Sequence, residues 1–486
     1  MINVKIDYDT GRRKGMIESD YFSNIREYFS VEDKNQKYKK KYSVGYSIPS
    51  RNYVITPQGR FEPRMYNELI DYLNTLDTPI NIELSEEFKN IVNPPSLKGE
   101  IIKLNNLDKL GISLRDYQKE SVLVALQKGY GVIILPTSAG KTLVLSTLIE
   151  SIRNQIKDVT TLVIVPNIQL LKQTYDECLQ YGISEKDISC WEGGASPNTK
   201  IVITNTQILQ SETQDISWLS RIDVLICDEC HKFRHGNEIN KIVSKIPAKY
   251  RYGLTGTLPE SKLDKWCING IFGSVIYTKT SEELRNNKQI SKVVISTIKV
   301  HYDPSRKFKK PNHLNPTEAY EEEIDFLHHN EFRNNTIVKL VNKVEKNVLV
   351  MVDRIVHGEL LYDLLSNGTN KRVYFIHGKI EIEDRENIRK LMESENDIVC
   401  VAISNIFSTG INIKNLHYII FAAIGKAKIK LIQSIGRSLR LHQSKEMAYI
   451  FDIADMLRYG WEHYTERLKI YIKEKIPVKE TPISEI

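Results

Sequence analysis

The sequence predicts an α/β protein with two parallel-sheet domains and a small α+β domain before them. Two stretches of the chain, about 99 to 280 and 331 to 457, alternate short apolar runs with helical patterns. This alternation is typical of parallel strands joined by crossover helices. The proline pair Pro94-Pro95 precedes the first stretch and marks a boundary, because a residue before proline is biased away from helix. The 486 residues allow about three domains.

The expected segments follow from these boundaries. They are a small α+β domain over 1–97, a first lobe over 98–285, a connector over 286–330, a second lobe over 331–457 and a helical tail over 458–486. In the small domain, strands are expected at 3–7 and 53–56, with apolar helical spacing at 22–29 and 65–73. The expected strands of the lobes are 132–135, 161–165, 200–204, 224–227, 252–255, 348–352, 372–376, 398–403, 418–422 and 448–452.

Composition is that of a globular protein, with 41% apolar and 27% charged residues and a net charge of +7. No run of 18 apolar residues occurs and the first twenty residues lack an apolar signal region, so we expect a cytoplasmic protein without a membrane partner. The cysteines include a single CxxC pair, Cys227 and Cys230. Without a second pair, reduced thiols are favoured over a zinc site.

A phosphate-binding loop is indicated by the segment from Leu135 to Thr142, directly after an apolar run. Small residues allow backbone N–H groups to close around phosphate oxygens, and the following helix turns its positive end to the anion. Lys141 would place its charge at the β- and γ-phosphates, and the Thr142 hydroxyl would bind magnesium. Leu135 stands where the general pattern has glycine, so an ordinary Gly-Lys turn is the alternative for this motif alone. The remaining candidate nucleotide contacts are Pro136, Thr137, Ser138, Ala139 and Gly140.

Two carboxylates, Asp228 and Glu229, end an apolar run that is typical of a buried parallel strand. Asp228 is expected to hold magnesium, directly or through water, and Glu229 to orient and deprotonate the attacking water. Solvated acids at a strand end are the alternative. The order of the two motifs, with a strand and a helix between them, favours a nucleoside triphosphatase.

A candidate adenine reader precedes the phosphate loop at Arg115 and Gln118. A glutamine amide can pair with the donor and acceptor edge of adenine, and an arginine can lie against the base. The alternative is an ordinary first turn of a helix, capped by Ser113 or Asp116.

The stretch from Lys34 to Arg64 is strongly basic, with eight Lys and Arg residues against the single acid Glu62. Tyrosines are interleaved with the cations. Phosphate neutralisation and aromatic stacking are how proteins hold nucleic acid, so this stretch is a candidate DNA- or RNA-binding surface. A solvated hairpin is the alternative. The triplet Lys39, Lys40 and Lys41 is the centre of the predicted surface.

The second lobe contains no phosphate loop, but it carries the segment Gln433-Ser-Ile-Gly-Arg437-Ser-Leu-Arg440. Two arginines three apart share one helix face. Such guanidinium groups suit the transition-state charge on a γ-phosphate, whereas a structural ion pair is the alternative.

These motifs, in this order over about 112 to 452, resemble those of superfamily-two helicases, most closely the UvsW-like helicases of tailed phages. The segments that carry the resemblance are Gln118, PTSAGKT, DECH, LTGT, STG and QSIGRSLR. The resemblance implies two RecA-like lobes that use ATP and Mg²⁺ to move 3′ to 5′ on DNA. It also implies remodelling of branched DNA, such as forks, junctions and R-loops, in recombination, repair and replication.

By motif, the resemblance implies that Thr255, Gly256 and Thr257 couple hydrolysis to lobe movement, and that Gln433 acts with the two arginines at the ATP site. The residues implied to line the strand track are Thr204, Thr206, Gln207, His377, Gly378, Thr409 and Gly410. Hydroxyls and backbone N–H groups there would contact phosphates without reading sequence. Ser434 and Asn412 depart from the usual family pattern, in which arginine and aspartate stand at these positions.

Three other functions fit some of these motifs. An RNA helicase would share every ATP motif, and the motor subunit of a restriction complex would need a nuclease partner. A DNA-binding scaffold with a nucleotide switch is disfavoured, because Lys141, Asp228, Glu229, Arg437 and Arg440 are all present. We expect a monomer that binds branched or single-stranded DNA in the host cytoplasm, with single-strand-binding or recombination proteins as possible partners.

Overall fold

The computed structural model describes residues 1–33, 50–136, 139–287, 292–303, 316–403, 413, 415–423 and 447–485. The chain forms two compact units, of which the first spans residues 1–136 and 140–279 and the second comprises residues 137–139 and 280–486. No helix in these described ranges is both long enough and apolar enough to cross a membrane.

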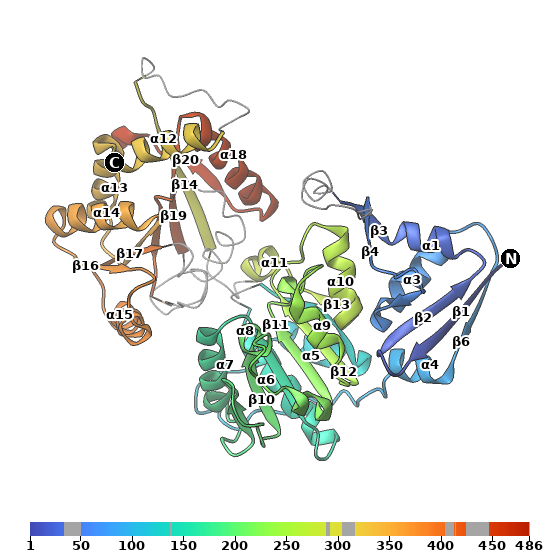
Figure 1. Cartoon of the computed structure of the whole chain (residues 1–486). Helices are drawn as coiled ribbons and strands as arrows, with labels where there is room; N and C mark the ends of the chain where they lie inside the picture. Colours follow the sequence, from blue (N-terminus) through green and yellow to red (C-terminus); the bar gives the residue numbers. More distant parts are fainter. Residues whose placement is uncertain are drawn as a thin grey trace. The chain divides into compact units, whose positions relative to one another are not determined.

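The first unit begins with a mixed sheet in the order β5-β2-β1-β6, in which β1 runs antiparallel to β2 and parallel to β6 (Figure 1). Its buried side chains alternate along β1, as expected for a strand with one face on a core. The elements are β1 (Ile2–Asp9), β2 (Lys14–Ser19), α1 (Phe22–Tyr28), β3 (Ser30–Glu32), β4 (Arg51–Tyr53), β5 (Arg60–Phe61), η1 (Pro63–Met65), α3 (Tyr66–Leu73), β6 (Ile80–Leu84) and α4 (Glu86–Val92). The strand expected at 53–56 is therefore β4, displaced toward the N-terminus.

This N-terminal domain shares its core with the lobe that follows. Trp266, on α10 (Lys262–Phe272), packs among the apolar side chains of the small domain and meets the ring of Phe29 at a centroid distance of 5.3 Å. Polar bonds surround this contact. Ser244 Oγ donates to Glu62 Oε1 at 2.7 Å, and Asn269 Nδ2 donates to Glu68 Oε1 at 2.6 Å. The small domain and the first lobe are thus joined by both apolar and polar contacts.

The first lobe is a parallel sheet whose seven described strands have the order β13-β7-β12-β11-β8-β10-β9. Its central strands are buried on both faces, which explains their continuous apolar runs. The strands are β7 (Tyr130–Ile134), β8 (Thr161–Val165), β9 (Ile188–Cys190), β10 (Ile201–Asn205), β11 (Val224–Asp228), β12 (Tyr250–Thr255) and β13 (Val275–Thr278). The helices are α5 (Asp116–Lys128), α6 (Lys141–Gln155), α7 (Ile168–Tyr181), α8 (Thr206–Leu209), η2 (Ser217–Arg221), η3 (Cys230–Lys232), α9 (Glu238–Ser244) and α10.

The second unit contains another parallel sheet, with seven described strands in the order β16-β17-β15-β18-β19-β14-β20. The strands are β14 (Lys292–Val300), β15 (Val348–Val352), β16 (Arg372–Ile376), β17 (Ile398–Ile403), β18 (Tyr418–Phe421), β19 (Met447–Asp455) and β20 (Val478–Glu480). The helices are α11 (Ser281–Asn286), α12 (Pro316–His329), α13 (Glu331–Lys343), α14 (Ile355–Gly368), α15 (Ile382–Ser394), α18 (Arg458–Lys473) and η4 (Ile483–Glu485). The stretch expected as a connector contributes β14, and the expected helical tail contributes β20 as well as α18.

These two sheets, each flanked by helices, form the predicted pair of RecA-like α/β lobes (Figure 1).

Candidate nucleotide-binding site

The candidate site of the first lobe lies where three neighbouring parallel strands end. In the sheet, β12 stands between β7 and β11. The chain leaves β7 into the phosphate loop, leaves β11 at Asp228 and leaves β12 at Thr255. Because parallel strands all point the same way, these three ends meet at one edge of the sheet, the usual ligand site of open α/β sheets.

Gly140 shapes the described end of the phosphate loop. Its φ of 75° lies in the left-handed region, and it is the N-cap of α6, which begins at Lys141. A Cβ atom at this position would lie 2.7 Å from Gln118 Nε2. Only glycine fits both the backbone and the space here. Pro136 and Ala139 are buried beside it, whereas the predicted contacts Thr137 and Ser138 lie outside the described residues.

A chain of polar contacts starts at Lys141. Its Nζ lies 3.0 Å from Glu229 Oε1, and both side chains are largely buried. The other carboxylate oxygen of Glu229, Oε2, lies 3.1 Å from His231 Nδ1. The same His231 nitrogen lies 2.9 Å from Thr255 Oγ1, whose hydroxyl donates to Thr257 O at 2.8 Å. The ammonium group that would meet phosphate is therefore connected to the segment after β12.

The pKa values of the two adjacent carboxylates are shifted in opposite directions. Burial alone would raise the pKa of Glu229, but the Lys141 charge and the His231 hydrogen bond outweigh it and hold that pKa well below its ordinary value. Burial and the negative charge of Glu229 raise the pKa of Asp228 to about 6, against the attraction of Lys141. Glu229 is thus ionised in the form that a general base requires. Its backbone adopts a φ of 52°, which is uncommon for a residue other than glycine.

His231 was not among the residues predicted for the site. The sequence places it two positions after Glu229, but its second contact, Thr255, is 24 residues further along the chain. Only the pairing of β11 with β12 brings the two side chains together. The signal available in the sequence was the place of His231 in the DECH segment, two positions after Glu229.

Gln118 lies beside the phosphate loop and is almost fully buried. Its Oε1 accepts a hydrogen bond from Arg115 N at 2.9 Å, so the amide oxygen holds the first turn of α5. Arg115 directs its guanidinium to the Tyr117 hydroxyl at 3.4 Å. Gln118 therefore lies in the first turn of a helix, as in the alternative, but the N-cap is Arg115 and not Ser113 or Asp116. Reading of adenine stays a prediction.

The predicted strand-track residues of the first lobe differ in exposure. Thr204 is fully buried in β10, and its hydroxyl donates to Trp191 O at 2.9 Å. Thr206 follows the strand and donates to Pro166 O at 3.1 Å, whereas Gln207 is exposed. In the second lobe, Gly378 is exposed and follows His377 at the end of β16. Of these residues, Gln207 and Gly378 are the most accessible to a ligand.

Much of the predicted basic surface has internal partners where the structure describes it. Arg51 contacts Glu27 at 2.9 Å, Arg60 contacts Asp9 at 3.4 Å, and the buried Arg64 donates to Lys249 O at 2.8 Å. The other predicted residues of the sites lie outside the described residues: Lys39, Lys40, Lys41, Thr409, Gly410, Gln433, Arg437 and Arg440.

The described site has the parts that a nucleoside triphosphate with a divalent cation requires. A helix begins at the loop, a lysine points at the strand ends, and two carboxylates stand opposite it. Phosphate is held by such helix N-termini and lysines, and Mg²⁺ by a hydroxyl and a carboxylate. Thr142 and Asp228 remain the predicted ligands of the cation.

The fold and the site define a nucleic-acid-dependent ATPase of the helicase class. The family described as "Type III restriction enzyme, res subunit" matches residues 111–260. The family described as "Helicase conserved C-terminal domain" matches residues 333–442.

Two relatives narrow the family to which the chain belongs. It is 30% identical over 390 residues to the ATP-dependent DNA helicase uvsW of Enterobacteria phage T4, covering 74% of this chain and 75% of that protein. It is 26% identical to the DNA 3′-5′ translocase XPB2 of Sulfurisphaera tokodaii, covering 68% of this chain and 79% of that protein. The chain belongs to the superfamily-two helicases, in the UvsW-like family.

A solved structure shows the same fold at low sequence identity. Dbp5 of Saccharomyces cerevisiae, bound to RNA and ADP BeF3, superposes with a TM-score of 0.54. The match is 11% identical and covers 78% of this chain and 93% of that one.

Proposed function

We propose that this UvsW-like helicase uses ATP to move 3′ to 5′ on DNA and to unwind or branch-migrate forks, junctions and R-loops. Such an activity would serve recombination, repair and replication of a phage genome. The support is the match to three quarters of the T4 uvsW helicase, together with the match to a relative named as a 3′-5′ translocase.

The observation that carries the ATPase part of this proposal is the contact chain from Lys141 through Glu229 and His231 to Thr255. A translocase must convert a change at the phosphates into movement elsewhere. Here Lys141, which is expected to sense phosphate, is linked through Glu229 and His231 to Thr255, which is expected to couple hydrolysis to movement. Loss of any member should reduce turnover.

Individual residues have separate roles in this proposal. Lys141 and the N–H groups around Gly140 bind the phosphates, and Glu229 orients the attacking water and accepts its proton. Asp228 and the Thr142 hydroxyl hold Mg²⁺, which when bound neutralises charge on the phosphate oxygens. Arg115 and Gln118 contact the base. Gly256 and Thr257 move with Thr255.

The second lobe would supply the arginine fingers. We assign Arg437 and Arg440 to the γ-phosphate, where such groups can raise turnover roughly 10³- to 10⁵-fold, and Gln433 to the same cleft. The residues that would contact DNA are Thr206, Gln207, His377, Gly378, Thr409 and Gly410. Lys39, Lys40 and Lys41 would form an additional phosphate-binding surface. Thr204 would support β10 from within the sheet.

Strand-displacement assays test the substrate and the polarity. We would compare duplexes with a 3′ tail, duplexes with a 5′ tail, forks, four-way junctions and RNA duplexes, each with ATP and Mg²⁺, and use Lys141→Ala as the inactive control. The proposal predicts unwinding of forks, junctions and 3′-tailed DNA. Unwinding only from 5′ tails would contradict the polarity, and activity confined to RNA would make the protein an RNA helicase.

A further inference from the structure

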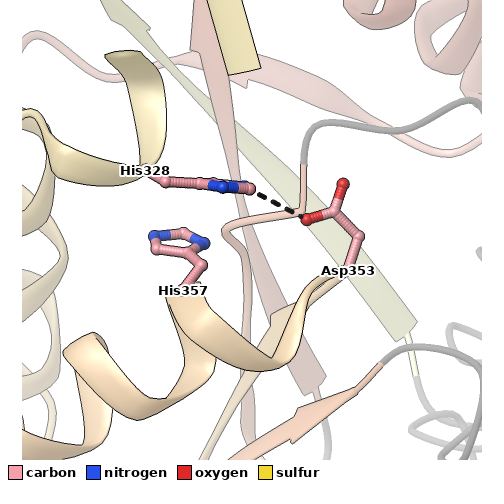
Figure 2. A group of neighbouring side chains, drawn as sticks. All are labelled: His328, Asp353 and His357. Carbon is pink, nitrogen blue, oxygen red and sulfur yellow. Dashed lines mark ion pairs between the residues drawn. The ribbon is translucent and has the colours of Figure 1, made fainter. Parts of the chain in front are cut away.

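A cluster of two histidines and one aspartate lies in the second unit, built from three separate elements. His328 is in the last turn of α12, Asp353 follows β15, and His357 is in the first turn of α14. In Figure 2 the two imidazole rings lie one above the other and Asp353 faces His328. The ring centroids are 4.4 Å apart, and His328 Nε2 lies 3.5 Å from Asp353 Oδ1.

The hydrogen bonds around His357 determine which of its ring nitrogens has a free lone pair. Asn334 Nδ2 donates to His328 O at 2.8 Å, which turns Asn334 Oδ1 toward His357 Nε2 at 3.3 Å. An amide oxygen can only accept, so Nε2 carries the proton and Nδ1 carries the lone pair. Ligating histidines in metal sites are held in this way, by an acceptor for the other ring N–H.

Both histidines are buried and present a nitrogen without a hydrogen-bond partner among the described residues. His357 is 0% exposed and His328 is 4% exposed. In this cluster the nitrogens without a hydrogen bond are His328 Nε2, which has the Asp353 carboxylate 3.5 Å away, and His357 Nδ1. An unsatisfied buried nitrogen is costly, which favours a ligand that has not yet been assigned.

The charges around the cluster are compatible with a cation. The positive charge near His357 is the guanidinium of Arg333. Arg333 itself is neutralised by Asp455, with Nε 2.9 Å from Oδ1 and Nη2 3.2 Å from Oδ2. The Asp353 carboxylate, whose side chain is 22% exposed, brings negative charge and a path from solvent.

We propose that His328 Nε2, His357 Nδ1 and the Asp353 carboxylate bind one divalent transition-metal ion of the Zn²⁺ class. Their ligand atoms lie within 4.8 Å of one another. Two imidazoles and one carboxylate are a typical zinc ligand set, with bonds of about 2.0–2.2 Å and a fourth position for water. Binding would draw the three ligand atoms closer together than they lie without the ion. The ion would tie the end of α12 to the start of α14.

Metal binding by the full chain tests the site directly. The purified protein, stripped with a chelator and kept free of nucleotide and Mg²⁺, would be titrated with Co²⁺ while visible absorption is recorded. We expect one Co²⁺ ion to bind per chain and to show the visible absorption bands of a low-symmetry site. Zn²⁺ should displace the bound Co²⁺. Zn²⁺ at about 100 times its Kd should also raise Tm by about 5 °C or more. Absence of saturable binding by the wild-type chain would overturn the proposal.

Variants locate the ion. His328→Gln and His357→Gln should each weaken binding by about 100-fold or more, because each removes a ligand. Asp353→Asn keeps the shape of a partly exposed side chain, so it tests the site even if a histidine variant fails to fold. His329→Gln is the matched control, since His329 is the next residue and its side chain is 57% exposed. Wild-type affinity in Asp353→Asn and His328→Gln would place the ion elsewhere and refute the assignment.

Discussion

Lys141 and Glu229 form a buried ion pair, 3.0 Å from Nζ to Oε1, between the first residue of α6 and the residue after β11. The lysine expected to bind phosphate thus holds the carboxylate expected to activate water. An arriving triphosphate would compete for the same ammonium group, because both are anions. The pair therefore connects nucleotide binding to the charge state and freedom of the general base.

Glu229→Gln removes the base but keeps the size of the side chain. We expect hydrolysis stimulated by nucleic acid to fall by about 10²- to 10⁴-fold, the usual contribution of a general base, while nucleotide still binds. Turnover and nucleotide binding would be measured on the same preparation. Glu238→Gln, on the exposed start of α9, is the control and should leave turnover unchanged. Equal turnover in both variants would exclude Glu229 as the base.

Gly140→Ala adds a single methyl group to the phosphate loop. Its Cβ would lie 2.7 Å from Gln118 Nε2 on a backbone with φ of 75°, so either the loop or the Gln118 amide must shift. We expect the affinity for ATP to drop at least about tenfold, from left-handed strain of roughly 1–2 kcal/mol plus the contact. Gly111→Ala is the control, because it adds left-handed strain without a contact. Gly111 has a φ of 61° and no neighbouring atom within 4 Å of the added Cβ. The same loss of ATP affinity in Gly111→Ala would count against a local effect.

Arg333→Met leaves Asp455 buried without its guanidinium partner. The Arg333 side chain is 0% exposed and that of Asp455 is 2% exposed. Breaking such a pair costs about 3–5 kcal/mol, so denaturant unfolding should show a clear loss of stability. Arg354→Met removes one partner of the exposed pair with Glu321, and should cost less than about 1 kcal/mol. Similar losses of unfolding free energy in the two variants would show that the contribution of the Arg333–Asp455 pair does not depend on its burial.

Trp266→Ala tests the junction between the N-terminal domain and the first lobe. The indole is 8% exposed and lies in the core of the small domain, so its removal should cost about 3–5 kcal/mol. We also expect faster proteolysis in the segment 93–98, which joins the two parts. Trp461→Ala is the comparison, because that side chain is 42% exposed. Unchanged proteolysis in Trp266→Ala would mean that the polar contacts alone hold the domain.

The sequence was most informative where strands are buried on both faces. The strands 161–165, 348–352 and 398–403 were predicted with the bounds that the structure has, because their apolar runs are short and uninterrupted. The edge strand 372–376 was also predicted with its bounds, although only its last residue, Ile376, is buried. Edge strands such as β13 and β20 carry exposed side chains and lack this signal. The segment 292–300 mixes apolar residues with lysine, serine and threonine, its partner β19 lies about 150 residues later, and no local pattern reports so distant a pairing.

The same distinction applies to the sites. Lys141, Asp228 and Glu229 could be named because each belongs to a short motif whose spacing reflects its chemistry. The link from His231 to Thr255 and the buried position of Thr204 depend on strand order, which the motifs do not contain. The cluster of His328, Asp353 and His357 depends on where the end of α12 lies relative to the start of α14, and no spacing in the sequence indicates that these three residues meet.

Steady-state ATP hydrolysis by the purified chain tests the central claim most directly. It would be measured with no nucleic acid, single-stranded DNA, forked DNA, a four-way junction and RNA, with Lys141→Ala as the control. We expect strong stimulation by branched DNA and almost no turnover in Lys141→Ala, which should remain folded. Stimulation by RNA alone, or normal turnover in Lys141→Ala, would contradict a DNA helicase driven by this site.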